Sequence, residues 1–254
     1  MNKDRIYYFD KTLPLIKYYS RKNKTGKEHN MIVSSFESVI DIFFKNSELK
    51  VAVFIEPCLG TGYPDIVFVE YDENIFLESA VEIEELDNID LALLFEISRK
   101  KTISVSKLED LLGYNRAKIL KSITELNRLN LISIHDNIFR INKEMPYFRI
   151  NRVISIEAKI DKWNEAIEQA NNNSQFSTES YIMLNKDKCS DIINNRCNEL
   201  GIGIITVNGH IVKQKSACKR KYPVSSTSMM FCEWIIRNYN INVENEDGEI
   251  RRII

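Results

Sequence analysis

The chain has 254 residues, of which 44% are hydrophobic and 28% are charged, with a formal net charge of -1. This is the composition of an ordinary globular protein, with room for one large or two small domains. It contains no repeat, no low-complexity tract and no apolar run near the ~20 residues needed to cross a bilayer, so we expect no membrane partner. The balanced charge gives no global reason to expect a polyanionic ligand.

Charge is distributed unevenly along the chain. Residues 70–96 hold ten acidic side chains and no basic one, whereas residues 99–128 hold eight basic and three acidic side chains. Such blocks suggest separate surfaces with separate tasks, although solvated faces explain the acidic block equally well.

The cysteines and histidines form no motif. No two cysteines have the spacing of zinc ligands, which favours reduced thiols and a cytoplasmic location over a His-Cys metal site. We expect the histidines to be incidental. These residues are Cys58, Cys189, Cys197, Cys218 and Cys232, with His29, His135 and His210.

The pattern of the first 70 residues predicts a short helix, a loop, a second helix and then two strands. The start, through about Asn30, is polar and predicts a short helix and a loop at residues 21–27. Ser34 or Ser35 is the expected N-cap of the next helix, whose apolar stripe includes Phe36, Val39, Ile40 and Phe43. Residues 51–55 and 64–70 predict strands.

A folded insert is expected in the middle of the chain. Between Asp65 and Glu157 lie 91 residues, far more than a plain connection needs. Residues 89–98, 106–113 and 115–130 have helical patterns, with Gly113 ending the second helix and Leu120 facing inward on the third. Residues 131–141 predict a hairpin that turns at 135–137. Three helices and a two-stranded wing predict a winged helix-turn-helix domain at 88–143, inserted into a discontinuous host domain at 1–87 and 144–254.

The host domain resumes with alternating strands and helices. Strands are predicted at 153–160, 181–184 and 201–208, and helices at 163–172 and 189–200. This order predicts an α/β fold with parallel crossovers. A last helix is expected at 227–239, and the final dozen residues are expected to be frayed or bound in a dimer.

A carboxylate and an ammonium share one face of the strand near residue 157. Residues two apart in a strand point the same way, so Ser155, Glu157 and Lys159 face one side and an apolar row faces the other. Asp65 stands at the mouth of an earlier strand. Two carboxylates and a lysine at neighbouring strand ends can hold a divalent metal and position a water against a phosphate. The alternative is an exposed cross-strand pair of little energetic consequence.

Taken together, these motifs resemble the PD-(D/E)XK nuclease superfamily, which includes many restriction endonucleases and Holliday-junction resolvases. The resemblance covers roughly residues 31–71 and 150–225 and not the insert. It implies a restriction-endonuclease-like mixed central sheet flanked by helices. The residues that carry it are Glu37 on the first helix, Pro64-Asp65, Glu157-Ala158-Lys159, Gln169 on the following helix, and the glycine-led strand from Gly201.

The resemblance also implies roles for these residues. Asp65 and Glu157 would bind Mg²⁺, with the Ala158 carbonyl as a further ligand and Mn²⁺ as a substitute metal. Lys159 would orient the attacking water. Glu37 would reach a second metal or a metal-bound water, and Gln169 would hydrogen-bond near the lysine or a phosphate. For Glu37 and Gln169 the alternative is an ordinary helix-surface residue.

The third helix of the insert offers polar and basic side chains for DNA. In a helix-turn-helix this helix enters the major groove. Arg can read guanine and Asn adenine, while lysines more often contact phosphates. A protein-docking module is the alternative. The candidate residues are Asn115, Arg116, Lys118, Lys121 and Ser122, and a second basic cluster follows at 213–221.

The sequence therefore predicts a Mg²⁺-dependent endonuclease for double-stranded DNA, acting in restriction or another defence role. One alternative is a non-catalytic DNA-binding regulator that uses the winged helix on a nuclease-fold scaffold. Another is a repair or RNA nuclease, against which the sequence-reading insert argues.

Overall fold

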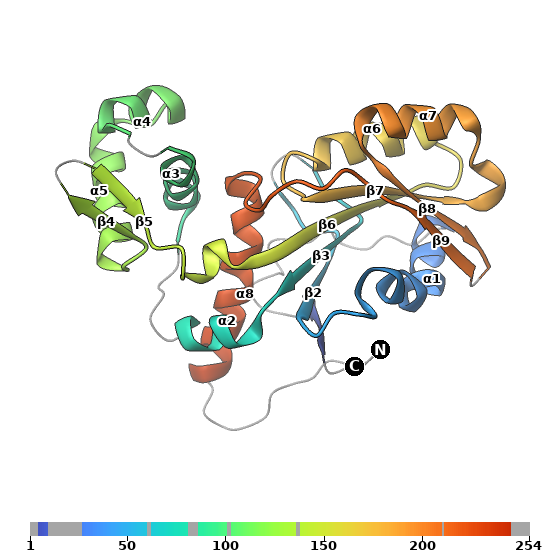
Figure 1. Ribbon diagram of the computed structural model, residues 1–254, viewed down its shortest axis with the longest axis horizontal. Coiled ribbons are helices and arrows are strands. Elements are labelled where there is room, and N and C mark those ends of the chain that lie inside the picture. The colour runs from blue at the N-terminus through green and yellow to red at the C-terminus, as the bar shows by residue number, and fades with distance from the viewer. Residues whose placement is uncertain are drawn as a thin grey trace. The chain divides into compact units, whose positions relative to one another are not determined.

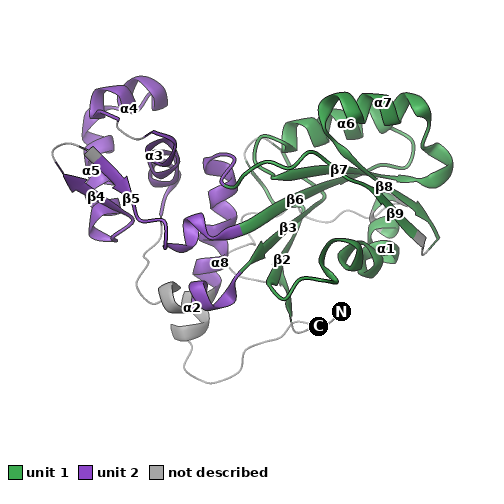
Figure 2. Cartoon of the chain, viewed as in Figure 1, with its two compact units in different colours: residues 1–71, 151–222, 252–254 green, residues 72–150, 223–251 purple. Residues whose placement is uncertain are grey.

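The computed structural model describes residues 5–9, 27–59, 62–80, 86–100, 103–135, 138–209 and 211–244. It divides into two compact units (Figure 2). The first contains the described residues up to Tyr71 together with Asn151–Tyr222. The second contains Asp72–Ile150 and the described residues from Pro223 onward.

A mixed sheet of seven strands forms the first unit. Its order is β1-β2-β3-β6-β7-β8-β9. The pairs β1–β2, β6–β7 and β7–β8 are parallel, whereas β2–β3 and β8–β9 are antiparallel. The predicted α/β class with a mixed central sheet flanked by helices is therefore confirmed. The strands are β1 (Ile6–Phe9), β2 (Lys50–Ile55), β3 (Ile66–Tyr71), β6 (Ile150–Ala158), β7 (Glu179–Asn185), β8 (Gly203–Asn208) and β9 (Ile211–Lys215).

Helices cover both faces of this sheet (Figure 1). On one face α1 (Lys27–Phe44) packs through a core that includes Phe44 and Met183. On the other, α6 (Trp163–Asn173) and α7 (Asp191–Leu200) pack against Ile182 and Leu184 of β7. The alternation along β7 is that of a strand buried on both sides. In β6, Ile154, Ile156 and Ala158 face the α1 side, as the sequence pattern predicted.

One expectation for the start of the chain is wrong, and one feature there was not predicted. Residues 6–9 form an unpredicted strand, in which Phe9 pairs with Phe54 of β2 and is buried against its ring. The short helix predicted near the start is not at these positions, and residues 10–26 lie outside the described residues. The helix that carries Ser34 and Ser35, α1, begins at Lys27, so neither serine is its N-cap. Ser35 lies inside α1, where its hydroxyl donates to the Met31 carbonyl one turn earlier. The predicted loop before Lys27, the turn residues 136–137 and residues 245–254 at the end of the chain lie outside the described residues.

The second unit combines helices with a two-stranded sheet, β4–β5. Gly113 ends α4 in a left-handed conformation with φ 69°, as expected for a glycine after a helix. Asp87 and Asp90 form a capping box at the start of α3. The elements are α2 (Glu73–Ala80), α3 (Asn88–Arg99), α4 (Val105–Leu112), α5 (Arg116–Arg128), β4 (Ile132–His135), β5 (Ile138–Ile141) and α8 (Ser226–Glu244).

This unit is larger than the insert expected at residues 88–143. One buried carboxylate, Glu233 of α8, links the segments on either side of the expected insert. It accepts hydrogen bonds from the Leu86 main chain at 3.1 Å and from Arg237 at 3.0 Å, and it also accepts from the Tyr147 hydroxyl. The segments before α3 and after β5 are thereby tied to α8, whose place in the chain is far from both. No described helix combines the length and the apolar character that a bilayer-spanning helix needs.

Candidate functional site at the ends of β3 and β6

An open pocket of about 450 Å³ lies in the first unit where β3 begins and β6 ends. The two strands are neighbours in the sheet, so residues distant in sequence meet there. Most of the lining side chains are charged or amide-bearing. The lining residues are Glu28, Gly62, Tyr63, Asp65, Glu157, Lys159, Lys162, Glu165 and Gln169.

Asp65 lies directly before β3 and is only 3% exposed. Its Oδ2 accepts a hydrogen bond of 2.8 Å from the main-chain N–H of Ala158 and lies 4.0 Å from Lys159 Nζ. A carboxylate that accepts from a backbone amide is held in one orientation by a strong, charge-assisted bond. The end of β6 therefore fixes the position of Asp65.

Glu157 is buried on the face of β6 that α6 covers, with 2% of its surface exposed. Its Oε1 accepts a hydrogen bond of 2.7 Å from Asn173 Nδ2 at the end of α6. Together with Asp65 it brings two nearly buried carboxylates to one pocket. Burying two ionised carboxylates has a large desolvation free energy unless nearby positive charges or hydrogen bonds compensate it.

Lys159 supplies the compensating charge. Its Nζ lies 3.7 Å from Glu28 Oε2, 4.0 Å from Asp65 Oδ2 and 3.3 Å from the Ala158 carbonyl oxygen. The residue is 7% exposed, and its main-chain N–H continues the sheet by donating to Met183 of β7. A buried ammonium between carboxylates beside an open pocket is an arrangement typical of functional sites.

The acidic residue that α1 contributes is Glu28, not Glu37. The two are nine residues apart, which in a helix is about 13.5 Å along the axis and half a turn around it. Glu28 faces Lys159, so Glu37 is on the opposite side of α1. Burial raises the pKa of the nearby Tyr8 hydroxyl, and the negative charge of Glu37 adds to the rise. Glu37 does not line the pocket. The structure therefore does not bring Glu37 together with the other predicted site residues.

Gln169 lines the pocket. It lies on the exposed side of α6, six residues after the start of the helix at Trp163. Lys162 and Glu165 precede it and form an exposed ion pair of 2.8 Å at the rim.

Glu28 and Asn173 contact the predicted site residues Lys159 and Glu157, and neither was predicted from the sequence. Asn173 had a usable signal, because it lies four residues after Gln169 on α6 and so near the same face. Glu28 had none, since the helix was expected to begin after it.

The residues present fit a hard divalent cation. Asp65 and Glu157 offer carboxylate oxygens, and the carbonyl of Ala158, the residue after Glu157, lies 3.3 Å from Lys159 Nζ. Mg²⁺ prefers oxygen ligands and keeps several waters, so a pair of carboxylates is enough. Across the part of the chain that the structure describes, no group of three or more His, Cys, Asp or Glu residues is arranged to hold a metal.

The predicted DNA-contacting residues on α5 have different surroundings. Asn115 caps the helix by accepting from the Lys118 main chain at 3.0 Å. Ser122 is 5% exposed and donates to Asp90 of α3, so it serves helix packing and not a partner. Arg116 is exposed and lies 3.5 Å from Glu109 of α4. Lys118 and Lys121 are exposed.

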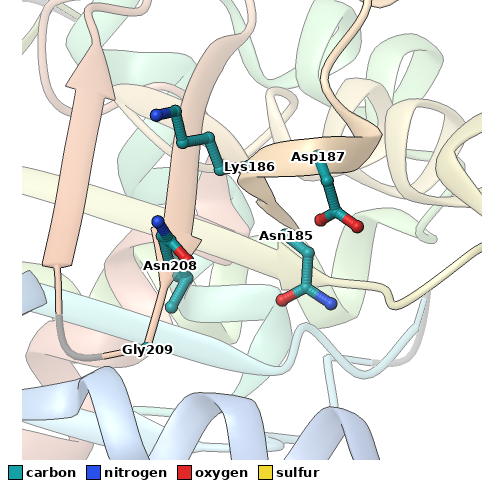
Figure 3. Close-up of a pocket in the computed structure, with 6 residues that line it drawn as sticks. Asn185, Lys186, Asp187, Asn208 and Gly209 are labelled. Atoms are coloured by element: carbon teal, nitrogen blue, oxygen red, sulfur yellow. The ribbon is translucent and has the colours of Figure 1, made fainter.

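A second open pocket, of about 460 Å³, lies at the carboxyl ends of β7 and β8 (Figure 3). Because β6, β7 and β8 are parallel, it opens at the same edge of the sheet as Glu157. It carries one lysine and one aspartate, and we assign it no chemistry. Its lining residues are Asn185, Lys186, Asp187, Val207, Asn208 and Gly209.

No protein-family model matches the chain, and comparisons with curated proteins and with solved structures give no significant match. The site must therefore be interpreted from its own chemistry.

Proposed function

We propose that the protein is a metal-dependent endonuclease that hydrolyses phosphodiester bonds in double-stranded DNA. One observation carries the proposal: Asp65, Glu157 and Lys159 are nearly buried and line a single pocket. The motif resemblance to PD-(D/E)XK nucleases adds weight, because it assigns the same three residues. Restriction or another defence role is the biological setting that we propose.

Asp65, Glu157 and the Ala158 carbonyl would hold the metal. A bound Mg²⁺ supplies Lewis-acid stabilisation of phosphoryl oxygens and a water of lowered pKa. The protein contributes rigidity, since the Ala158 N–H orients Asp65 and the Asn173 amide orients Glu157. Carboxylates held in this way need little reorganisation during the reaction.

Lys159 would provide the positive charge nearest the scissile phosphate. Its ammonium has three N–H donors and lies at hydrogen-bonding or ion-pair distance from groups on both strands. It can orient a water molecule and stabilise negative charge on the phosphoryl oxygens. Glu28 lies close enough to hold the ammonium in place. Gln169, at the pocket wall, can donate to a phosphate oxygen.

The second unit would deliver the target DNA. The order α3, α4, α5, β4, β5 is the element order of a winged helix-turn-helix, with α5 as the helix that enters the major groove. The exposed side chains of Lys118 and Lys121 suit phosphate contacts.

The proposal is tested by incubating the full-length protein with plasmid, phage and methylated DNA in Mg²⁺ or Mn²⁺. We expect discrete fragments that disappear on addition of EDTA. Asp65→Ala, Glu157→Ala and Lys159→Ala should each abolish cleavage, whereas Glu168→Ala, an exposed change on α6, should not. Full cleavage by any of the first three variants would refute the assigned site.

A second candidate is a non-catalytic DNA-binding regulator. It is favoured by the lack of a three-ligand metal group among the described residues and by the ion pairing of Lys159 with Asp65 and Glu28. DNA binding without metal-dependent cleavage on any of these substrates would support it.

A further inference from the structure

The exposed face of α5 is apolar at its centre. Ala117, Leu120 and Thr124 are all exposed, and helical geometry puts them within a sector of about 60°. Leu120 is 42% exposed, although its position in the sequence pattern predicted an inward side chain. The inward face of the helix is formed by other residues, Ile119, Ser122, Ile123 and Leu126.

Thr124 adds a methyl group to this face. Its hydroxyl donates a hydrogen bond of 2.9 Å to the Leu120 carbonyl one turn earlier. The hydroxyl proton is thus used within the helix, and the methyl remains for an external contact. Alanine, leucine and threonine side chains therefore form a short apolar row along α5.

Basic residues flank the row, but the arginines are already engaged. Arg116 pairs with Glu109 at 3.5 Å, and Arg128 Nε donates to Glu125 at 3.1 Å. Lys118 and Lys121 remain exposed on the same helix. With Glu125 as the one acidic residue of α5, the charge of the helix complements a phosphate backbone.

We propose that this row on α5 reads the C5-methyl groups of pyrimidines in the major groove. Thymine presents such a methyl there, and alanine and threonine methyls are established apolar partners for it. 5-Methylcytosine presents the same chemistry at the same groove position. The inference rests on the proposed function, in which α5 enters DNA, and adds to it the class of base that the protein selects.

The test uses the full-length Lys159→Ala variant, so that bound DNA is not cut. Duplexes are selected by this protein from two random libraries, one unmodified and one with every cytosine replaced by 5-methylcytosine. Each selected duplex is then rebuilt with uracil for thymine, or with cytosine for 5-methylcytosine. These changes remove methyl groups and leave Watson–Crick hydrogen bonding intact.

We expect affinity to fall by about fourfold for each contacted methyl that is removed. Loss of affinity on replacing thymine by uracil would show that the contacted methyl group belongs to thymine. Loss of affinity on replacing 5-methylcytosine by cytosine would show that it belongs to 5-methylcytosine. Leu120→Ala should reduce the difference in affinity between duplexes with and without the methyl groups. Leu111 on α4 is similarly exposed, and Leu111→Ala should leave this difference unchanged. Lys121→Ala should weaken all duplexes alike and lower the salt slope by about one unit.

Equal affinity with and without the methyl groups would overturn the inference and leave the nuclease proposal standing. DNA cleavage by the wild type with no selectable duplex would also overturn it and would assign the α5 face to a protein partner. Methyl-dependent binding without any cleavage would support the inference and refute the nuclease proposal.

Discussion

The main-chain N–H of Ala158 donates a 2.8 Å hydrogen bond to Oδ2 of Asp65, so the start of β3 is fastened to the end of β6. The bond uses the backbone of the residue between Glu157 and Lys159. It therefore sets the position of one carboxylate relative to the strand that carries the other two functional side chains.

Two substitutions at Asp65 should distinguish the contribution of its negative charge from that of its hydrogen bond with the Ala158 main chain. In Asp65→Asn the side-chain carbonyl can still accept from Ala158, whereas in Asp65→Ala it cannot. We expect both variants to lose cleavage activity by at least about 100-fold, because each removes the charge. Only the alanine variant should lower the free energy of unfolding, by about 1–3 kcal/mol. Cleavage assays and urea titrations measure the two effects, and an active asparagine variant would contradict the assigned role.

Two glutamates on α1 form a matched pair for testing the site. Glu28 Oε2 lies 3.7 Å from Lys159 Nζ, and Glu37 is on the opposite side of the helix. Glu28→Gln should reduce cleavage about 10-fold, the effect of removing a charged partner from a nearly buried ammonium. Glu37→Gln should leave the rate within twofold. The reverse order of effects, in the same assay, would restore the original expectation for Glu37.

The residues of the candidate site were easier to predict from the sequence than the residues that hold them in position. Asp65, Glu157 and Lys159 could be found because strand periodicity places side chains on known faces and because they stand at strand ends. Glu28 could not, since a helix boundary depends on contacts that the sequence does not display. Leu120 was misplaced because helical periodicity alone does not say how wide the buried stripe is.

The sequence also did not indicate which residues belong to the second unit. The pattern of three helices and a hairpin is local and readable, and the described chain contains all five elements. Glu233 of α8 accepts hydrogen bonds from Leu86 and Tyr147, which are far from it in the sequence. A polar contact between residues so far apart in sequence has no periodic signature.

Gly203 should be intolerant of a side chain. A Cβ at this position would lie 2.2 Å from the Tyr181 ring and 2.9 Å from the Ala217 main-chain nitrogen. Gly203→Ala should therefore lower the free energy of unfolding by about 1–3 kcal/mol through overpacking. Gly62→Ala is the control, because nothing lies within 4 Å of its added methyl. The free energies of unfolding are measured by urea titration. An equal decrease in both variants would show that neighbouring residues shift to accommodate the added methyl group at position 203.

Glu233 should make the stability of the second unit depend on pH. Burial raises the pKa of Glu233 from 4.5, although the hydrogen bonds from Tyr147 and Arg237 oppose the rise. The folded state therefore holds the proton at pH values where the unfolded state has released it. Stability from this group is full below about 4.5 and is lost as pH rises through the folded pKa.

Glu233→Gln removes this titration and is the variant to compare. The difference in unfolding free energy between glutamine variant and wild type should shift in favour of glutamine as pH rises above 4.5. The chain has two tryptophans, so in a Trp163→Phe background the fluorescence of Trp234 reports on α8. A pH-independent difference would mean that Glu233 has the same pKa in both states.

Asn173 should act as a positioning residue for Glu157. Its amide donates to Glu157 Oε1 at 2.7 Å from a buried site at the end of α6. Asn173→Ala should lower cleavage about 10- to 100-fold, the range expected for losing one hydrogen bond to a charged group. It should also raise the Mg²⁺ concentration that gives half-maximal rate, which a purely structural defect would not do. Asn172→Ala, an exposed neighbour on the same helix, should change neither quantity. If both variants lose activity at unchanged Mg²⁺ dependence, Asn173 supports α6 and not the orientation of Glu157.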